Sequence, residues 1–152
     1  MQKQNISLHQ EILFFPIFPV YVEYEKLRQV AGWVKVDREA VRKGLENPLF
    51  SVCAVLNNKA IGCGRVVGDG GIYFYIQDVI VLPEFQGKGI GRRIMDAIME
   101  YLRKHAYDNS FIGLMAAKGV SAFYEKYGFK KRASDSPGMF LMWKKQSDLN
   151  YL

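Results

Sequence analysis

The sequence predicts an α+β fold, in which a mixed and mostly antiparallel central sheet carries helices on both faces. Between residues 49 and 82, three apolar, strand-like runs are joined by tight turns, which is typical of an antiparallel meander. A long amphipathic helix then links the last of these strands to a further short strand, and such a crossover makes its two strands parallel. The chain has 152 residues, so we expect a single domain over residues 1–152 with its own hydrophobic core.

Two helices are expected ahead of the meander. Residues 23–31 consist mainly of helix formers and end at a glycine. Residues 37–46 begin with Asp37, whose carboxylate suits an N-cap, and this helix stops before Pro48. The first twenty residues carry no pattern that assigns an element.

The remaining elements follow from periodicity. Apolar residues recur with a period of about 3.6 after residue 90, which predicts a helix, whereas β-branched and aromatic runs indicate strands. The expected strands are residues 49–56, 60–67, 72–82, 111–115 and 138–145, and the further expected helices are residues 90–106 and 119–127.

The charge of the chain is basic but not concentrated. The formal net charge is +6 and the isoelectric point is near 9.3. Lysines and arginines are dispersed, without a run of five or more, which argues against a nucleic-acid partner. The apolar run at residues 12–22 is short and holds two prolines, so we expect neither a signal peptide nor a transmembrane helix, and no membrane partner.

The two cysteines, Cys53 and Cys63, both lie in apolar, strand-like runs, where we expect buried free thiols. Such thiols fit a reducing compartment, so the cytoplasm is the expected location. The two histidines, His9 and His105, are far apart, and no cysteine–histidine cluster has the spacing of a metal site. We therefore expect no metal.

The segment 84-EFQGKGIGRRIM-95 places Gly87, Gly89 and Gly91 where a helix is about to begin. Glycine is a poor helix former, but it lets a ligand approach the backbone without meeting a Cβ atom. The first N–H groups of a helix lack internal acceptors and the helix dipole adds positive potential, so a phosphate or diphosphate is the expected guest. The spacing of these glycines excludes both the P-loop and the dinucleotide-binding pattern.

The pattern that remains is Q-x-x-G-x-G, from Gln86 to Gly91, after a strand that a proline ends. It resembles the acyl-CoA-binding motif of the GCN5-related N-acetyltransferase (GNAT) superfamily. A second segment, 122-AFYEKYGF-129, is similar to the distal signature of that family, and the two segments occur in the family's order. The resemblance covers residues 49–132 and implies the acyl-CoA N-acyltransferase fold.

The resemblance also implies a function, the transfer of an acetyl group from acetyl-CoA to a primary amine of a small molecule or peptide by direct attack. The pantetheine amides would pair with the backbone of Val79, Ile80 and Val81, and the N–H of Val81 would stabilise the oxyanion. The diphosphate would lie on the glycine segment. The residues that the resemblance implies for diphosphate binding are Gln86, Gly87, Lys88, Gly89, Ile90, Gly91 and Arg92.

Two proton transfers accompany this reaction. Tyr124 matches the family's tyrosine that protonates the leaving thiolate, and a phenol with a pKa near 10 is protonated at neutral pH. The base stays open between Asp78, Glu84 and water. Asp78 shares a strand face with Ile80, and a carboxylate inside an apolar strand needs either a function or a partner.

One position departs from the family pattern, because Gly119 stands where many members carry an asparagine that contacts the cofactor. The family's acceptor pocket is built from the N-terminal helices and the last strands, although aromatic residues there are as readily explained by core packing. The candidates for this pocket are Trp33, Tyr73, Phe74, Tyr75, Met139, Phe140 and Trp143. The sequence does not identify the amine.

Two other interpretations compete with a catalytic acetyltransferase. One is a non-catalytic CoA-binding sensor or subunit on the same fold, and the other is a basic nucleic-acid-binding module. We favour the enzyme, with acetyl-CoA as cosubstrate, an amine as its partner and a homodimer as the assembly to consider.

Overall fold

The structure is a computed structural model, and it describes residues 11–145 of the chain. Contacts within the chain divide it into two compact units, Met1–Met115 and Ala116–Leu152. Each unit is described by itself, and the single domain expected over residues 1–152 stays a prediction.

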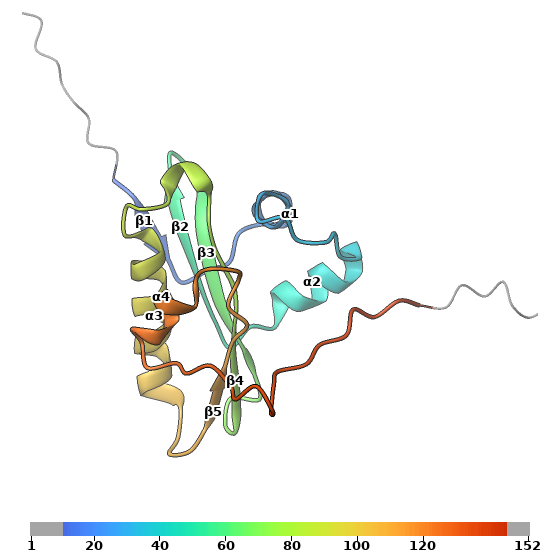
Figure 1. The fold of residues 1–152 in the computed structure, drawn as a ribbon. Helices are drawn as coiled ribbons and strands as arrows, with labels where there is room; N and C mark the ends of the chain where they lie inside the picture. The colour runs from blue at the N-terminus through green and yellow to red at the C-terminus, as the bar shows by residue number, and fades with distance from the viewer. Residues whose placement is uncertain (1–10, 146–152) are drawn as a thin grey trace, which may run out of the picture. The chain divides into compact units, whose positions relative to one another are not determined.

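The first unit is built on a five-stranded sheet (Figure 1). In order across the sheet, its strands are β1 (Leu13–Phe15), β2 (Phe50–Leu56), β3 (Lys59–Gly68), β4 (Tyr73–Val81) and β5 (Phe111–Gly113). All neighbouring strands are antiparallel except β4 and β5, which are parallel. This topology confirms the expected meander and crossover. Strand β1 was not expected, because three residues are too few to leave a period-two pattern.

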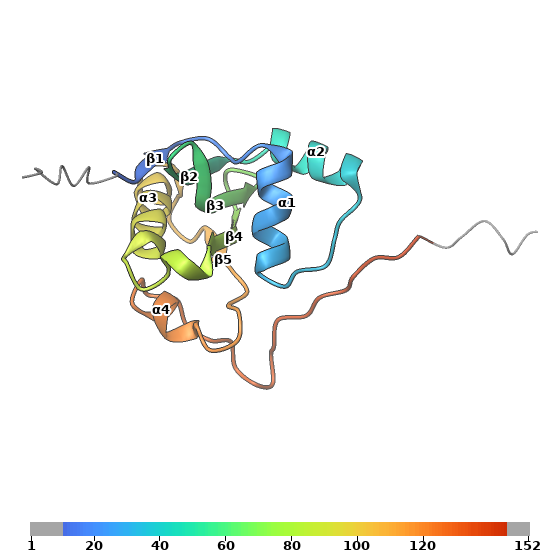
Figure 2. The same cartoon turned by 90° about the horizontal axis from the view of Figure 1, so that it is seen from above.

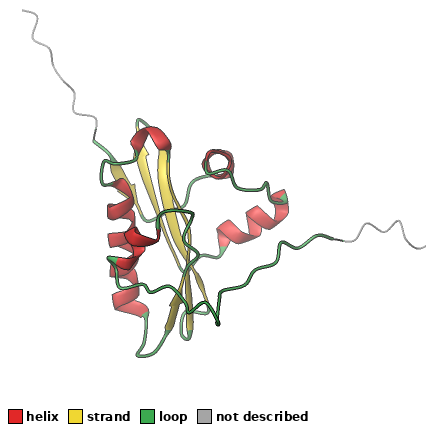
Figure 3. Ribbon diagram, viewed as in Figure 1, coloured by secondary structure: helices red, strands yellow, loops and turns green. Residues whose placement is uncertain are grey.

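Helices cover both faces of the sheet, as expected. Helices α1 (Tyr21–Val30) and α2 (Arg38–Glu46) lie on one side of the strands, and α3 (Ile90–His105) lies on the other (Figure 2). The expected N-cap of α2 is confirmed, because the Asp37 carboxylate accepts hydrogen bonds from two backbone N–H groups of the first turn. A short 3-10 helix, η1 (Pro83–Phe85), follows β4 and leads to the glycine segment (Figure 3).

Two glycines of β3 bring α3 close to the sheet. A Cβ atom on Gly64 would lie 2.8 Å from Cγ2 of Ile94. A Cβ atom on Gly62 would lie 3.2 Å from Cδ1 of the same isoleucine. Successive side chains of a strand point to opposite faces, so Cys63 and Arg65 point toward α1 and α2 instead. The most deeply buried side chains of α3, Ile94, Met95 and Ile98, fill the space that these glycines leave.

The two cysteines are buried free thiols, as the sequence indicates. Cys53 of β2 and Cys63 of β3 are directly opposite each other in the ladder. Burial raises the pKa of Cys53 to about 11 and that of Cys63 well above its usual range. Both thiols therefore stay protonated at neutral pH and pack as small apolar side chains.

The second unit contains one helix among its described residues, α4 (Ser121–Glu125), which is shorter than the expected 119–127. The strand expected over residues 138–145 is wrong for this structure, in which these residues pair with no strand. An apolar run can form a strand only where another strand offers hydrogen-bonding partners. Residues 116–145 contribute no buried side chain.

Candidate active site

The glycine segment adopts the backbone conformation that an anion cradle requires. Gly87 has φ +73° and Gly89 has φ +80°, in the left-handed region that favours glycine. A Cβ atom on either residue would meet no protein atom within 4 Å. The backbone conformation therefore explains these glycines, whereas packing within the protein does not, and the open space beside them would admit a ligand.

Helix α3 begins at this glycine segment. Gly89 is the N-cap, no side chain caps the helix, and the first turn holds no acidic residue. The helical ladder begins with the N–H of Arg93 donating to the carbonyl of Gly89 at 3.1 Å. Helix geometry thus leaves the N–H groups of Ile90 and Gly91 without an intrahelical acceptor, which is the arrangement that binds phosphate groups.

The end of β4 has an open edge beside this cradle. Strand β5 pairs with β4 only between Tyr73 and Tyr75, whereas β4 continues to Val81 along β3. Among the described residues of this unit, no strand covers the rest of that edge. An extended chain could pair there by β-strand addition.

Hydrogen bonds settle which backbone groups face the open edge. The N–H of Leu82 donates to the carbonyl of Ile61 on β3 at 2.9 Å. Because successive N–H groups of a strand alternate in direction, those of Val79 and Val81 point away from β3, and that of Ile80 points toward it. The geometry therefore supports Val79 and Val81 as backbone contacts for a ligand more than it supports Ile80.

Gln86 has a partner within the protein. Its Nε2 atom donates to the carbonyl of Val81 at 2.9 Å and so ties the glycine segment to the end of β4. This bond was not expected, because the sequence assigned Gln86 to the diphosphate. Lys88 lies over the ring of Phe85, with its Nζ atom 5.6 Å from the ring centroid. The contacts of Gln86 and Lys88 with a diphosphate stay predictions.

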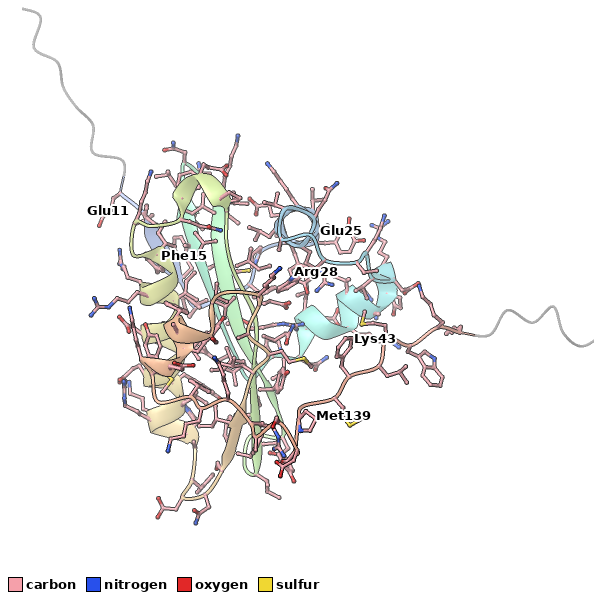
Figure 4. All side chains as sticks on the ribbon, viewed as in Figure 1. Glu11, Phe15, Glu25, Arg28, Lys43 and Met139 are labelled. Carbon is pink, nitrogen blue, oxygen red and sulfur yellow. The ribbon has the colours of Figure 1, made fainter. Side chains whose placement is uncertain are left out.

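Asp78 is the centre of a buried charge cluster. Its side chain is 1 % exposed, and its Oδ2 atom accepts hydrogen bonds from Nε of Arg65 at 2.7 Å and from the Tyr24 hydroxyl at 3.0 Å. The Oδ1 atom lies 3.6 Å from a guanidinium nitrogen of Arg28. Figure 4 shows Arg28 between α1 and α2. The partner that a carboxylate in an apolar strand requires is thus present, and Asp78 as base stays a prediction that its burial disfavours.

The other base candidate and the expected acid differ in their surroundings. Glu84 lies in η1 and is exposed to solvent. Tyr124 is partly buried in α4, where its ring packs edge-on against Phe123 and Phe129. Burial raises the pKa of Tyr124 above its ordinary value, so the phenol holds its proton throughout the neutral range. Its approach to the thioester stays a prediction.

Within the first unit, the candidates for an acceptor pocket do not line one common pocket. Phe74 is 1 % exposed and belongs to the core, so its assignment to the pocket is wrong. Trp33 lines a pocket of about 220 Å³ on α1, α2 and the loop between them. The residues around this pocket are Glu25, Arg28, Gln29, Trp33, Lys35, Val36 and Val41.

Residues 11–145 contain no cluster of three or more His, Cys, Asp or Glu side chains that could hold a metal ion. In the same range, no helix has the length and apolar character needed to span a bilayer.

Comparison with known proteins agrees with this geometry. Residues 48–131 match the family described as the acetyltransferase (GNAT) domain. The uncharacterized N-acetyltransferase ycf52 of Pyropia yezoensis is 34 % identical over 122 residues, which are 78 % of this chain and 69 % of that protein.

Solved structures share the fold. The crystal structure of SA2161, a probable acetyltransferase of Staphylococcus aureus, superposes with a TM-score of 0.83 at 36 % identity and covers 88 % of this chain and 100 % of its own. A GNAT acetyltransferase of Brucella melitensis in complex with acetyl-CoA has the same fold, with a TM-score of 0.55 at 20 % identity over 80 % of this chain and 84 % of its own. With its sheet, its glycine cradle and its relatives in agreement, the chain belongs to the GCN5-related N-acetyltransferase superfamily.

Proposed function

We propose that this protein transfers the acetyl group of acetyl-CoA to a primary amine of a small molecule or peptide, by direct attack of the amine on the thioester. The observation that carries the proposal is the position of the cradle: the left-handed glycines and the N-terminus of α3, which no side chain caps, follow the open end of β4 after the short helix η1. A nucleotide diphosphate on the cradle and an extended amide chain along β4 together describe coenzyme A.

The cradle would hold the diphosphate through backbone N–H groups from Gly87 to Arg92. The side chains of Lys88 and Arg92 add positive charge at the same place, and charge-assisted contacts to phosphate are roughly twice as strong as neutral ones. Because no acidic residue stands in the first turn of α3, the helix dipole acts on the ligand without opposition.

The pantetheine arm would extend the sheet along the open edge, with its amides paired to Val79 and Val81. This position brings the thioester carbonyl to the N–H of Val81, which would stabilise the negative charge that develops on the carbonyl oxygen. Such a donor is commonly worth about 3 kcal/mol in the transition state. The bond from Gln86 to the Val81 carbonyl supports the proposal, since it fixes the strand end that carries this donor.

The chemistry then needs few further groups. The neutral amine attacks the carbonyl carbon, the carbon–sulfur bond breaks, and Tyr124 donates its proton to the departing thiolate. The amine loses its own proton to Asp78, to Glu84 or to water. A pH profile of the Glu84→Gln variant tests the exposed candidate: loss of the acidic limb of kcat assigns the base to Glu84, and retention removes Glu84 from the reaction.

Acetyl-CoA binding and acetyl transfer are tested in sequence. We expect acetyl-CoA to raise the melting temperature, because a ligand that binds only the folded state stabilises it. We expect release of free thiol in the presence of a suitable member of a panel of polyamines, arylalkylamines, amino acids, aminoglycosides and peptides. Binding without thiol release on any amine would favour the sensor or subunit, and a lack of binding would overturn the proposal.

Assembly and location are separate expectations of the same proposal. A homodimer predicts a mass of about twice 17.4 kDa in sedimentation or light scattering at micromolar concentration. A cytoplasmic enzyme predicts that a tagged full-length chain fractionates with the cytosol.

A further inference from the structure

Strand β4 contains a bulge at the residue that the sequence analysis considered as the base. In the ladder with β3, Cys63 pairs with Ile80 and Arg65 pairs with Gln77, so that two residues, Asp78 and Val79, lie opposite Gly64 alone. Asp78 has φ +58°, in the left-handed region. Glycine is the usual residue at this place in a bulge, and aspartate and asparagine are among the few others that tolerate it.

The side-chain carboxylate and the backbone carbonyl of Asp78 both accept hydrogen bonds within the protein. Its carboxylate receives Arg65 and Tyr24, and its backbone carbonyl accepts a weak hydrogen bond from the Cys63 thiol at 3.3 Å. Arg65 is itself fixed, because its NH1 group donates to the carbonyl of Gly44 in α2 at 2.8 Å. The Asp78 carboxylate thus connects the bulge to α1 through Tyr24 and to α2 through Arg65.

The bulge decides which way the backbone beyond it faces. The directions of the side chains and N–H groups of a strand repeat every two residues. Inserting or removing one residue therefore reverses the direction of every side chain and N–H group that follows it. Without the extra residue, the N–H groups of Val79 and Val81 would point toward β3, and that of Ile80 would point to the open edge. The two groups that the proposed function assigns to pantetheine and the oxyanion are therefore available only because of the bulge.

We propose that Asp78 is a positioning residue: its buried carboxylate, held by Arg65 and Tyr24, stabilises the bulge that directs the N–H of Val81 toward the thioester. This inference rests on the proposed function for the identity of the ligand, but not for the shape of the strand. In this proposal, Asp78 contacts Arg65 and Tyr24 but does not contact the acceptor amine. The proton of the amine then leaves by Glu84 or by water.

Two double variants separate the conformation from the charge. Arg65→Met/Asp78→Gly and Arg65→Met/Asp78→Ala both remove the ion pair with Arg65, but only glycine adopts a positive φ freely. We expect acetyl-CoA affinity in the alanine variant to fall about tenfold below that in the glycine variant, because a left-handed alanine is disfavoured. Equal affinities in the two folded variants would overturn the proposal.

Hydrogen exchange followed by NMR reports the strand without any ligand. In the glycine variant the Val81 amide stays at the open edge and exchanges fast, whereas in the alanine variant it turns into the ladder with β3 and its exchange slows. Identical Val81 exchange in the two variants would also overturn the proposal. If the unaltered protein fails to bind acetyl-CoA, the proposed function is lost, while this exchange measurement still decides what Asp78 does to β4.

The single variant Asp78→Asn tests the competing assignment as base. Asparagine keeps the shape and tolerates the left-handed conformation, but it loses the charge that pairs with Arg65 and so weakens the bulge. We therefore expect a higher KM for acetyl-CoA and an unchanged acidic limb in the pH profile of kcat. A general base contributes about a hundredfold or more. Loss of the acidic limb, with kcat reduced by that factor and KM unaltered, would make Asp78 the base and end the positioning proposal.

Discussion

The two units of the chain differ in what stabilises them. The buried apolar side chains lie on α1, α2, the central strands and α3 of the first unit, whereas none of residues 116–145 is buried. In the second unit, an apolar run is open to solvent, with Met139 88 %, Phe140 75 % and Trp143 79 % exposed. Apolar burial stabilises a fold by roughly 25 cal/mol per Å². The first unit has a core of its own, and the second requires a surface to cover its apolar run.

This difference divides the proposed catalytic groups. The diphosphate cradle and the Val81 donor belong to the unit with the core, so their geometry is present before any ligand arrives. Tyr124 belongs to the second unit, whose described residues include no buried side chain. Binding of the cofactor and protonation of the leaving group should therefore respond separately to mutation, and the following predictions test this separation.

The largest expected effect lies in the core of the first unit. Ile94 is 0 % exposed and packs against the β3 glycines, so Ile94→Ala should lower the free energy of unfolding by about 2–5 kcal/mol. Chemical denaturation measures this change. Trp143→Ala is the matched control in the second unit, and a loss there as large as that of Ile94→Ala would mean that the two units share one core.

The next largest effect is expected at the cradle. Gly89→Val places a β-branched residue at a left-handed position and a side chain where the diphosphate would lie, so acetyl-CoA affinity should fall by about a hundredfold. Calorimetry measures the affinity, and circular dichroism verifies the fold. Gly32→Val, in the turn after α1, is the control, because Gly32 also has a positive φ of +75° and a Cβ atom there would meet no atom within 4 Å. Full affinity in Gly89→Val would remove the cradle from the mechanism.

A smaller effect is expected at the acid in the second unit. Tyr124→Phe should lower kcat by about tenfold to a hundredfold with little change in the KM for acetyl-CoA, because a thiolate leaves fairly well without help. Tyr107→Phe, at a residue that is 73 % exposed, is the control. A rise in the KM for acetyl-CoA equal to the fall in kcat would place Tyr124 in cofactor binding instead.

The same tyrosine predicts a pH dependence. Tyr124 acts while protonated, and burial raises its pKa, so its contribution to kcat should persist through neutral pH and be lost only as the pH rises through a value above 10. Tyr124→Phe should lack this alkaline limb. An alkaline limb that is the same in both proteins would assign it to another group.

The smallest effect is expected on the exposed run. Trp143→Ser should change the free energy of unfolding by less than about 0.5 kcal/mol, because the side chain is mostly in water. If the run is covered by a second copy of the chain, the same variant should instead weaken self-association in sedimentation experiments. A loss of stability without any change in association would show that the run packs within its own chain.

Periodicity predicted most of the first unit, because its strands and helices depend on local patterns. Strand β1 was missed because its partner on β2 lies far away in the sequence. Residues 138–145 carry the composition of a strand, but composition supplies no pairing edge. The Q-x-x-G-x-G pattern indicated where left-handed glycines precede a helix, since this conformation is a local property, whereas diphosphate binding there stays a prediction.

The surroundings of Asp78 could not be predicted in the same way. Tyr24, Arg28 and Arg65 reach it from α1 and β3, and Tyr24 is 54 positions away in the chain. The sequence required a function or a partner for a carboxylate in an apolar strand, and only the fold could supply the partner. Likewise, no spacing in the sequence indicates that Asp78 has a positive φ or that Gln86 bonds to Val81.

The small residues of β3 have a consequence for how the enzyme tolerates change. Gly62 and Gly64 set the thickness of the layer between strand and helix, and the first turn of that helix is the cradle. One added methyl group there would push Ile94 outward and carry the N-terminus of α3, to which we assign phosphate binding, away from the end of β4. A substitution in the interior, with no contact to any ligand, would thereby alter the distance between the two places that the proposed function assigns to one cofactor molecule.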